Sequence, residues 1–156
     1  MIILFYGQPA SGKTTLADAL VNQSDFGIDY YWNENFVRID GDKWRDVTNN
    51  KDYTKEGRIS NLLGAFNMAL YLELEGFTPI LSFVTPYEEL RQYLQSKSEN
   101  LIQIYLDYNT DRGRNMNFAN EFEIPKTKNL HLNTSDLNIN DCLYKINKYI
   151  QNNKNI

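Results

Sequence analysis

This sequence has one cysteine, Cys142, and one histidine, His131. A single cysteine cannot form an internal disulfide, which is typical of proteins of the reducing cytoplasm, so we expect a cytoplasmic protein. Its position on an apolar helical stripe favours buried packing over a reactive thiol. His131 falls in a short apolar run near the end of the chain, and we expect it to be structural and not catalytic.

Long apolar runs and an excess of basic residues are also missing. No run approaches the roughly 18 apolar residues that cross a membrane, so we expect no membrane partner. The short apolar start leads straight into a glycine-rich segment, unlike a signal peptide. A net charge of −4 argues against broad nucleic-acid binding, because a phosphate backbone attracts a basic face. With 156 residues, we expect one domain over residues 1–156.

The chain is organised around its first sixteen residues, MIILFYGQPASGKTTL. Residues 2–6 are apolar and rich in β-formers, which predicts a buried strand. Residues 7–14 match the phosphate-binding pattern G-x-x-x-x-G-K-[ST] without a mismatch, and an apolar helical pattern follows. A chance match in a glycine turn is the alternative, expected in well under about 1% of chains of this length. The motif therefore predicts a nucleoside-triphosphate site.

The residue types of this loop suit a phosphate. Gly7 and Gly12 allow backbone turns that a Cβ would block, so that N–H groups point inward to phosphate oxygens. Lys13 brings a positive charge to the transferring phosphate, and the Thr14 hydroxyl suits Mg²⁺. The implied cofactors are ATP and Mg²⁺. The expected ATP-binding residues of the loop are Gly7, Gln8, Pro9, Ala10, Ser11, Gly12, Lys13, Thr14 and Thr15.

Strand and helix patterns alternate along the rest of the chain. Further strands are expected at 37–40, 79–84, 101–106 and 129–132, and helices at 43–50, 59–74, 86–94 and 139–150. Residues 24–36 are aromatic and acidic without clean periodicity, which fits a short hairpin or a covering loop. The alternation predicts an α/β fold, with a five-stranded parallel sheet in the order 2-3-1-4-5 and helices on both faces.

Acidic and basic residues gather after the second expected strand, and ligands of such sheets lie beyond the carboxyl ends of the strands. Asp40, Asp42 and Arg45 come there, and carboxylates at a strand end suit Mg²⁺ or the alignment of an attacking hydroxyl. An ordinary Asp-Gly turn is the alternative. Arg58 and Asn61 lie three apart at the start of the long helix, so they share one face. That pair suits an anionic, base-containing acceptor, with an exposed helix surface as the alternative.

Three loop residues have competing interpretations. Thr85 opens a Thr-Pro-Tyr-Glu pattern typical of a capping box, so we expect its hydroxyl to cap the next helix while the loop backbone touches substrate. Tyr53 and Phe118 are aromatic residues in loops, where rings stack on a purine in some proteins and fill the core in others.

With these residues in view, the chain resembles the adenylylsulfate kinases, which use MgATP to phosphorylate the 3′-hydroxyl of adenosine 5′-phosphosulfate in sulfate assimilation. The resemblance covers most of the chain apart from roughly residues 24–36 and implies a P-loop NTPase three-layer sandwich. Its motifs are the phosphate loop at 7–14, Asp-Gly-Asp-x-x-Arg at 40–45, Asp-Tyr-Thr at 52–54 with Arg58 and Asn61, Ser-Phe-Val-Thr-Pro-Tyr at 82–87 and Phe-Glu-Ile-Pro at 122–125.

The resemblance also implies roles for individual residues. Asp42 would be a base linked to the metal, and Thr14, Asp40 and Asp42 would hold Mg²⁺. Lys13, with Arg112 or Arg114 from the lid, would offset charge on the transferred phosphate. The acceptor would be held by Asp40, Asp42, Arg45, Tyr53, Arg58, Asn61, Phe83, Val84, Thr85 and Phe118, with its adenine between Tyr53 and Phe118. The adenine of ATP would lie near Thr134.

Two departures concern the acceptor. The lid run Arg-Asp-x-Lys-Gly-Leu-Tyr of the family is missing from the short segment 111–117, and its paired arginines after Asn61 are replaced by Leu62, Leu63 and Gly64. A kinase of another nucleotide, nucleoside or polynucleotide 5′-hydroxyl is therefore the alternative, and a non-catalytic ATP-binding module is a third. We expect a small nucleotide as substrate and no nucleic-acid partner, and the sequence leaves a homodimer open.

Overall fold

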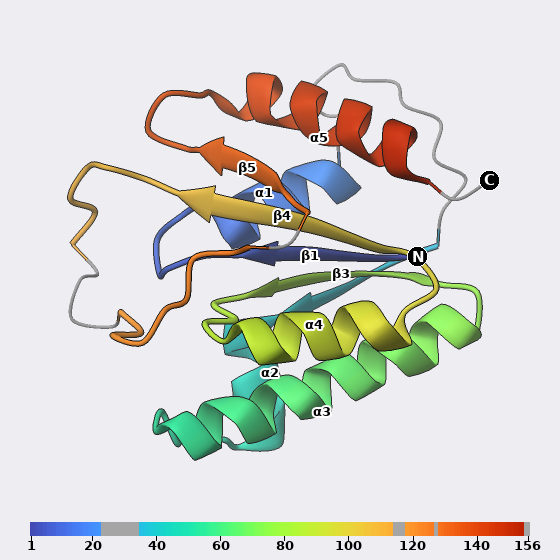
Figure 1. Cartoon of the computed structure of the whole chain (residues 1–156), viewed down its shortest axis with the longest axis vertical. Coiled ribbons are helices and arrows are strands. Elements are labelled where there is room, and N and C mark those ends of the chain that lie inside the picture. The colour runs from blue at the N-terminus through green and yellow to red at the C-terminus, as the bar shows by residue number, and fades with distance from the viewer. Residues whose placement is uncertain (23–34, 114–117, 127, 155–156) are drawn as a thin grey trace.

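One parallel sheet of five strands, in the order β2-β3-β1-β4-β5, forms the centre of the molecule (Figure 1). The structure is a computed structural model that describes residues 1–22, 35–113, 118–126 and 128–154. The elements are β1 (Ile2–Tyr6), α1 (Lys13–Val21), β2 (Phe36–Asp40), α2 (Gly41–Thr48), α3 (Lys55–Leu74), β3 (Thr78–Phe83), α4 (Glu88–Lys97), β4 (Leu101–Asp107), β5 (Leu130–Asn133) and α5 (Ile139–Asn153). The predicted fold class and strand order are confirmed.

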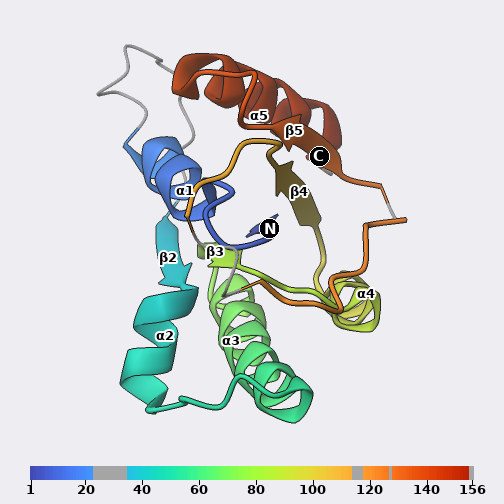
Figure 2. The ribbon, with the colours of Figure 1, turned by 90° about the vertical axis from the view of Figure 1, so that its left-hand side faces the viewer.

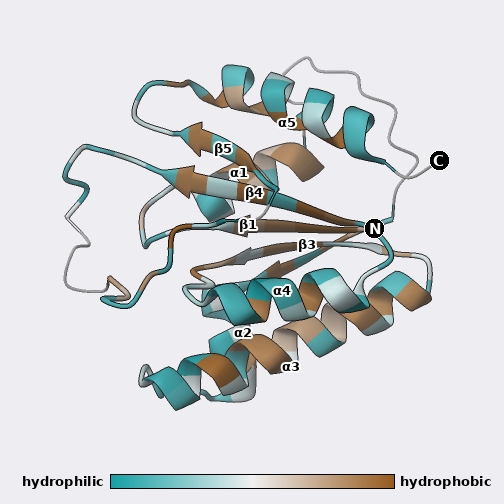
Figure 3. Ribbon diagram, viewed as in Figure 1, coloured by the Kyte–Doolittle hydropathy of each residue, from teal (hydrophilic) through white to brown (hydrophobic). Residues whose placement is uncertain are grey.

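The central strand β1 is buried on both faces, which explains its unbroken apolar sequence. Ile3 and Phe5 pack with residues of α1 and α5 on one face, and Leu4 and Tyr6 pack with residues of α3 and α4 on the other. Figure 3 shows apolar residues filling the central strands, while α5 carries polar residues on its outer side. Cys142 of α5 is 1% exposed, which confirms the buried packing role expected of it. No helix among the described residues is long and apolar enough to cross a membrane.

The start of α2 differs from its predicted position at Lys43. The helix begins at Gly41, directly after β2, because the Asp40 side chain caps its first turn. One carboxylate oxygen, Oδ1, accepts hydrogen bonds from the backbone N–H groups of Asp42 at 3.2 Å and Lys43 at 3.3 Å. Of the segment 24–36, residues 24–34 lie outside the described residues, and Phe36 opens β2.

The apolar stripe predicted on α3 is buried at Leu62 and Phe66 but is wrong at Leu74, which is 77% exposed. The buried position of the last turn belongs instead to Glu73, whose carboxylate pairs with the N-terminal amine of Met1 at 2.9 Å. Leu74 is about 100° further round the helix and so faces solvent.

The capping box expected at Thr85 does not form. The helix α4 begins at Glu88, and Thr85 lies three residues earlier with a left-handed φ of 46°. Its carbonyl oxygen is turned inward, where it accepts a hydrogen bond from Nη1 of the fully buried Arg91 at 2.7 Å. The free N–H of Glu88 is capped by the carboxylate of Glu123, at 2.6 Å.

Candidate active site

The phosphate loop connects β1 to α1 at the carboxyl edge of the sheet, the edge that Figure 2 faces. Gly7 has a φ of 147°, and a Cβ there would lie 2.1 Å from the carbonyl oxygen of Leu106, so only glycine fits. Gly12 is the N-cap of α1, with a φ of 92° and no side-chain cap among the described residues. The first-turn N–H groups and the positive end of the helix dipole therefore face the loop, an arrangement that binds anions.

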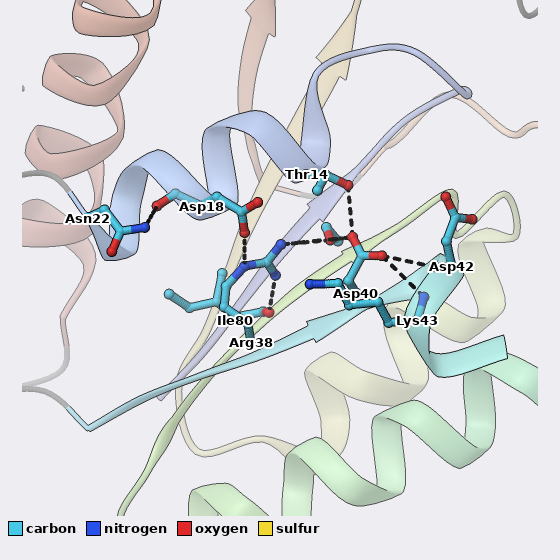
Figure 4. Close-up of polar contacts among 9 residues, drawn as sticks. Thr14, Asp18, Asn22, Arg38, Asp40, Asp42, Lys43 and Ile80 are labelled. Atoms are coloured by element: carbon cyan, nitrogen blue, oxygen red, sulfur yellow. Dashed lines mark hydrogen bonds and ion pairs between the residues drawn. The ribbon is translucent and has the colours of Figure 1, made fainter. Parts of the chain in front are cut away.

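The hydroxyl that the sequence suggested for Mg²⁺ faces the carboxylate that ends β2. Thr14 Oγ1 donates a hydrogen bond to Asp40 Oδ2 at 2.8 Å, across the gap between α1 and β2 (Figure 4). The Ser82 hydroxyl donates to the same oxygen at 2.9 Å. Burial alone would raise the pKa of Asp40, but these two hydrogen bonds, with help from Lys43 N–H and Arg38, outweigh it and hold the pKa below its ordinary value. Asp40 is therefore ionised at neutral pH.

These oxygens suit Mg²⁺, which prefers one or two carboxylates together with water and phosphate oxygens. Within the described residues no group of three or more His, Cys, Asp and Glu side chains could enclose a metal ion. The described residues therefore do not enclose a metal with protein ligands alone. They do form a hydroxyl–carboxylate pair, Thr14 and Asp40, beside an anion site. Asp42, in the first turn of α2, holds its exposed carboxylate apart from the Thr14–Asp40 pair (Figure 4).

One cavity of about 960 Å³ joins the phosphate loop to the end of β2 and the start of α3. It brings together most of the residues predicted for both substrates. Its lining includes Pro9, Ala10, Gly12, Lys13, Thr14, Thr15, Asp40, Asp42, Arg45, Tyr53, Arg58, Asn61, Phe83, Val84, Thr85 and Phe118.

Three predicted loop residues do not line the cavity. Gly7 is packed against Leu106, and Ser11 is fully buried. Gln8 turns its amide to the backbone of Ala119, where it donates to the carbonyl at 2.9 Å and accepts from the N–H at 3.0 Å. Gly7, Gln8 and Ser11 therefore stabilise the conformation of the loop without lining the cavity.

The far wall of the cavity carries two arginines around one ring. The guanidinium carbon of Arg45 lies 4.3 Å from the ring centre of Tyr53, and that of Arg58 lies 5.7 Å from it. Burial, together with the like charge of Arg58, lowers the pKa of Arg45 from its ordinary value, though an arginine stays charged at neutral pH. Asn61 is 5% exposed, and its Oδ1 has no hydrogen-bond partner in the described chain. This wall can therefore receive a ligand that is both anionic and able to hydrogen-bond.

A second, smaller pocket of about 190 Å³ lies behind Gly12 and Thr15 and is lined by Arg112 and Thr134. Nη1 of Arg112 donates to the carbonyl of Ala10 at 2.8 Å and to Thr134 Oγ1 at 3.0 Å. The structure thus places Arg112 beside Thr134 and not on the wall of the larger cavity. Arg114, which was predicted together with Arg112 to offset charge on the transferred phosphate, lies outside the described residues. His131 pairs with Asp107 at 2.8 Å and is not among the residues that line either pocket.

Sequence reasoning missed two residues that contact Asp40. Ser82 enters the sequence analysis only as the first residue of the motif at 82–87, and Arg38 falls within the strand expected at 37–40 without a role of its own. Nη2 of Arg38 lies 3.9 Å from Asp40 Oδ2. The available signal was the spacing, because residues two apart in a strand point to the same face.

The comparisons with known proteins agree with this geometry. The family model described as adenylylsulphate kinase matches residues 1–130. The chain belongs to the adenylylsulphate kinase family. It is 31% identical to a probable adenylyl-sulfate kinase of Pseudomonas aeruginosa, over 68% of this chain and 48% of that protein. It is 28% identical to the cytidine diphosphoramidate kinase of Campylobacter jejuni, over 68% of this chain and 59% of that protein. The chain therefore spans about half to three-fifths of the length of these two relatives.

Among solved structures, this member of the adenylylsulphate kinase family is similar to the Mycobacterium tuberculosis APS kinase in complex with AMPPNP and APS. The TM-score is 0.79 at 17% identity, and the match covers 96% of each chain. At this level of identity the likeness establishes the fold, which is that of the P-loop NTPases.

Proposed function

We propose that this protein is a kinase that transfers the γ-phosphate of ATP to the 3′-hydroxyl of adenosine 5′-phosphosulfate. The observation that carries the proposal is the shared cavity, which is lined on one side by the phosphate loop and on the other by Arg45 and Arg58. A transfer between two bound nucleotides needs both to enter one space. A volume of about 960 Å³ is at the upper end for ligand pockets and suits two of them.

On the donor side, the phosphates bind at the N-terminus of α1, where Lys13 supplies a full positive charge. Thr14 and Asp40 would hold Mg²⁺, which when bound neutralises charge on the β- and γ-phosphates. Thr134 and Arg112, which line the smaller pocket, are placed to receive the base of ATP. In this position Arg112 donates hydrogen bonds to the loop backbone and to Thr134. We therefore assign to Lys13 alone the role of offsetting the negative charge on the transferred phosphate.

On the acceptor side, the two arginines bind the anionic part of the nucleotide. The Oδ1 of Asn61, which has no partner among the described residues, accepts a hydrogen bond from a donor group of the same ligand. Tyr53 and Phe118 offer ring faces for its base. Asp42 accepts no hydrogen bond from another described residue, so its carboxylate is available to align the acceptor hydroxyl and take its proton. Chemistry of this kind needs a carboxylate that reaches the cavity, as Asp42 does.

A second candidate acceptor is a cytidine nucleotide, because one relative is a cytidine diphosphoramidate kinase. The acceptor wall also lacks the paired arginines that sequence resemblance leads one to expect after Asn61. At Gly64 an added Cβ would lie 3.4 Å from the indole of Trp44, in van der Waals contact with that ring. On this wall, Arg45 and Arg58 are therefore the residues that neutralise the negative charge of the acceptor.

The proposal is tested by incubating the protein with MgATP and a panel of acceptors, and identifying products by mass spectrometry. The panel contains adenosine 5′-phosphosulfate, cytidine diphosphoramidate, simple nucleosides and an oligonucleotide with a 5′-hydroxyl. We expect adenosine 5′-phosphosulfate to gain one phosphate at its 3′ position. Phosphorylation of the cytidine compound alone would replace the acceptor, and ATP binding without a phosphorylated product would mean a non-catalytic module.

A further inference from the structure

Two pairs of residues connect α1 to β2 beside the phosphate loop. Thr14 and Asp18 are four apart on α1 and so lie on one face of the helix. Arg38 and Asp40 are two apart on β2 and so lie on one face of the strand. The first pair is Thr14 with Asp40 at 2.8 Å, and the second is Asp18 Oδ1 with Arg38 Nε, also at 2.8 Å (Figure 4).

The Arg38 guanidinium also reaches the neighbouring strand β3. Nη1 donates to the carbonyl of Ile80 at 2.8 Å, and Nη2 donates to Ser82 Oγ at 3.2 Å. A serine hydroxyl has only one proton. Because its oxygen receives the N–H of Arg38, that proton is directed to Asp40 Oδ2, at 2.9 Å. Arg38 therefore orients the donor that holds Asp40.

Packing alone does not account for an arginine here. Phe36, two residues earlier on the same face of β2, packs against the apolar core. The Arg38–Asp18 pair is partly exposed, at 19% and 55% for the two side chains, and ion pairs of this kind contribute about 0–1 kcal/mol to stability. What the arginine adds is geometry, because its planar fork holds three acceptors on two elements, α1 and β3, at once.

We propose that Arg38 is a positioning residue of the Mg²⁺ site, which bridges Asp18 and Ser82 so that Asp40 stays against Thr14. The inference rests on the proposed function in that it requires a nucleotide in the phosphate loop. Partners that orient metal-binding groups in this way typically change metal affinity by about 10–100-fold when lost. Arg38 therefore determines how strongly Mg²⁺ improves nucleotide binding.

The charge of Arg38 could itself repel a cation, so the test must separate charge from geometry. Asp18 balances that charge at 2.8 Å, and the combined change Arg38→Gln with Asp18→Asn leaves the net charge of the pair at zero. A matched control exists in Lys51 and Asp46, an ion pair of 2.9 Å with side chains 67% and 73% exposed. Lys51→Gln with Asp46→Asn makes the same chemical change away from the cavity.

The experiment is calorimetric titration with the non-hydrolysable analogue AMPPNP, once with Mg²⁺ and once with EDTA. For the Arg38/Asp18 variant we expect the improvement given by Mg²⁺ to fall about tenfold, while affinity in EDTA stays at the wild-type value. Electron paramagnetic resonance of Mn²⁺ bound with AMPPNP should show the same loss. The Lys51/Asp46 control should match the wild type in both.

Two results would overturn the inference. One is a variant that keeps the full effect of Mg²⁺, and the other is an equal loss of affinity with and without Mg²⁺, which indicates general damage to the fold. Arg38→Lys keeps the charge but loses the fork, so it should show the same selective loss even if the double variant folds poorly. If the wild-type protein binds no AMPPNP at all, the proposed function fails, which is a different outcome from a wild type that binds and a variant that is unchanged.

Discussion

Two aspartates only two residues apart have different environments, and this difference fixes their roles at the residue scale. Asp40 accepts hydrogen bonds from Thr14, Ser82 and two backbone N–H groups, and its side chain is 10% exposed. Asp42 is exposed at the cavity and accepts none from the described residues. A carboxylate with hydrogen bonds to both oxygens keeps its position, whereas one exposed at the cavity can take a proton.

Asp42→Asn should therefore lower kcat by at least about 100-fold, the usual contribution of a positioned base. Affinity for AMPPNP should stay close to the wild-type value, because Asp42 lies apart from the Thr14–Asp40 pair. Steady-state kinetics and calorimetry on the same preparation give both numbers. Near-native turnover would remove Asp42 from the chemistry.

Arg58→Ala should raise the KM for the acceptor by about tenfold or more, since a hydrogen bond to a charged group contributes about 1.5–3 kcal/mol. The KM for ATP should not change, because Arg58 lies at the start of α3, on the wall opposite the phosphate loop. Lys51→Ala, which removes an exposed positive charge outside the cavity, is the control. Unchanged acceptor kinetics in Arg58→Ala would show that the acceptor binds elsewhere.

At the scale of elements, the loop between β3 and α4 depends on one buried guanidinium. Arg91 is 0% exposed and donates to the carbonyls of Thr85 and Glu123 and to the carboxylate of Glu88. It thereby fixes the loop that lines the cavity and ties it to residues 118–126. Removal of one partner from a buried pair leaves the other charge uncompensated.

Arg91→Leu should accordingly lower the free energy of unfolding by about 3–5 kcal/mol, measured by urea denaturation. Lys51→Gln, which breaks only an exposed pair, should change it by less than about 1 kcal/mol. A loss for Arg91→Leu no larger than that of the control would mean that the loop is held by other contacts.

The same cluster predicts a dependence of stability on pH. Burial opposes the charge of Glu88, but hydrogen bonds and the charge of Arg91 prevail and hold its pKa below the ordinary value. The folded state therefore binds this proton less readily than the unfolded state. The contribution is fully present above the unfolded pKa of about 4.3 and is lost as the pH falls through the lower folded value.

Urea midpoints measured at several values between pH 7 and pH 3 test this. The wild-type protein should lose stability below about pH 4.3, and Glu88→Gln should start lower at pH 7 but lose less on acidification. Parallel curves for the two proteins would show that Glu88 titrates alike in both states.

At the scale of the whole molecule, the sequence predicts the layers and the site edge well because these follow from local patterns. The apolar strands, the phosphate loop and the helix stripes each lie within one stretch of chain, and the rule for parallel sheets then places their ends together. Contacts between distant residues are not visible in such patterns. Arg91 binds the Thr85 carbonyl, so the predicted capping box at Thr85 was wrong. The N-terminal amine pairs with Glu73, so the predicted burial of Leu74 was wrong as well.

In the candidate site, too, local patterns are predictable from the sequence and contacts between distant residues are not. Residue types at the cavity follow from motifs, and their gathering follows from topology. The bridge from Asp18 through Arg38 and Ser82 to Asp40 spans α1, β2 and β3, and only the folded chain brings these elements together. Arg112 likewise meets Ala10 and Thr134 across the fold.

We propose that ATP and the acceptor nucleotide bind in one cavity, where the γ-phosphate is transferred between them. A single-turnover reaction with γ-³²P-labelled ATP, Mg²⁺ and adenosine 5′-phosphosulfate tests it most directly. We expect the label to appear on the 3′-hydroxyl of adenosine 5′-phosphosulfate in step with ADP formation, and we expect Lys13→Ala to abolish both. Label that stays in ATP or is released only as inorganic phosphate would contradict this proposal.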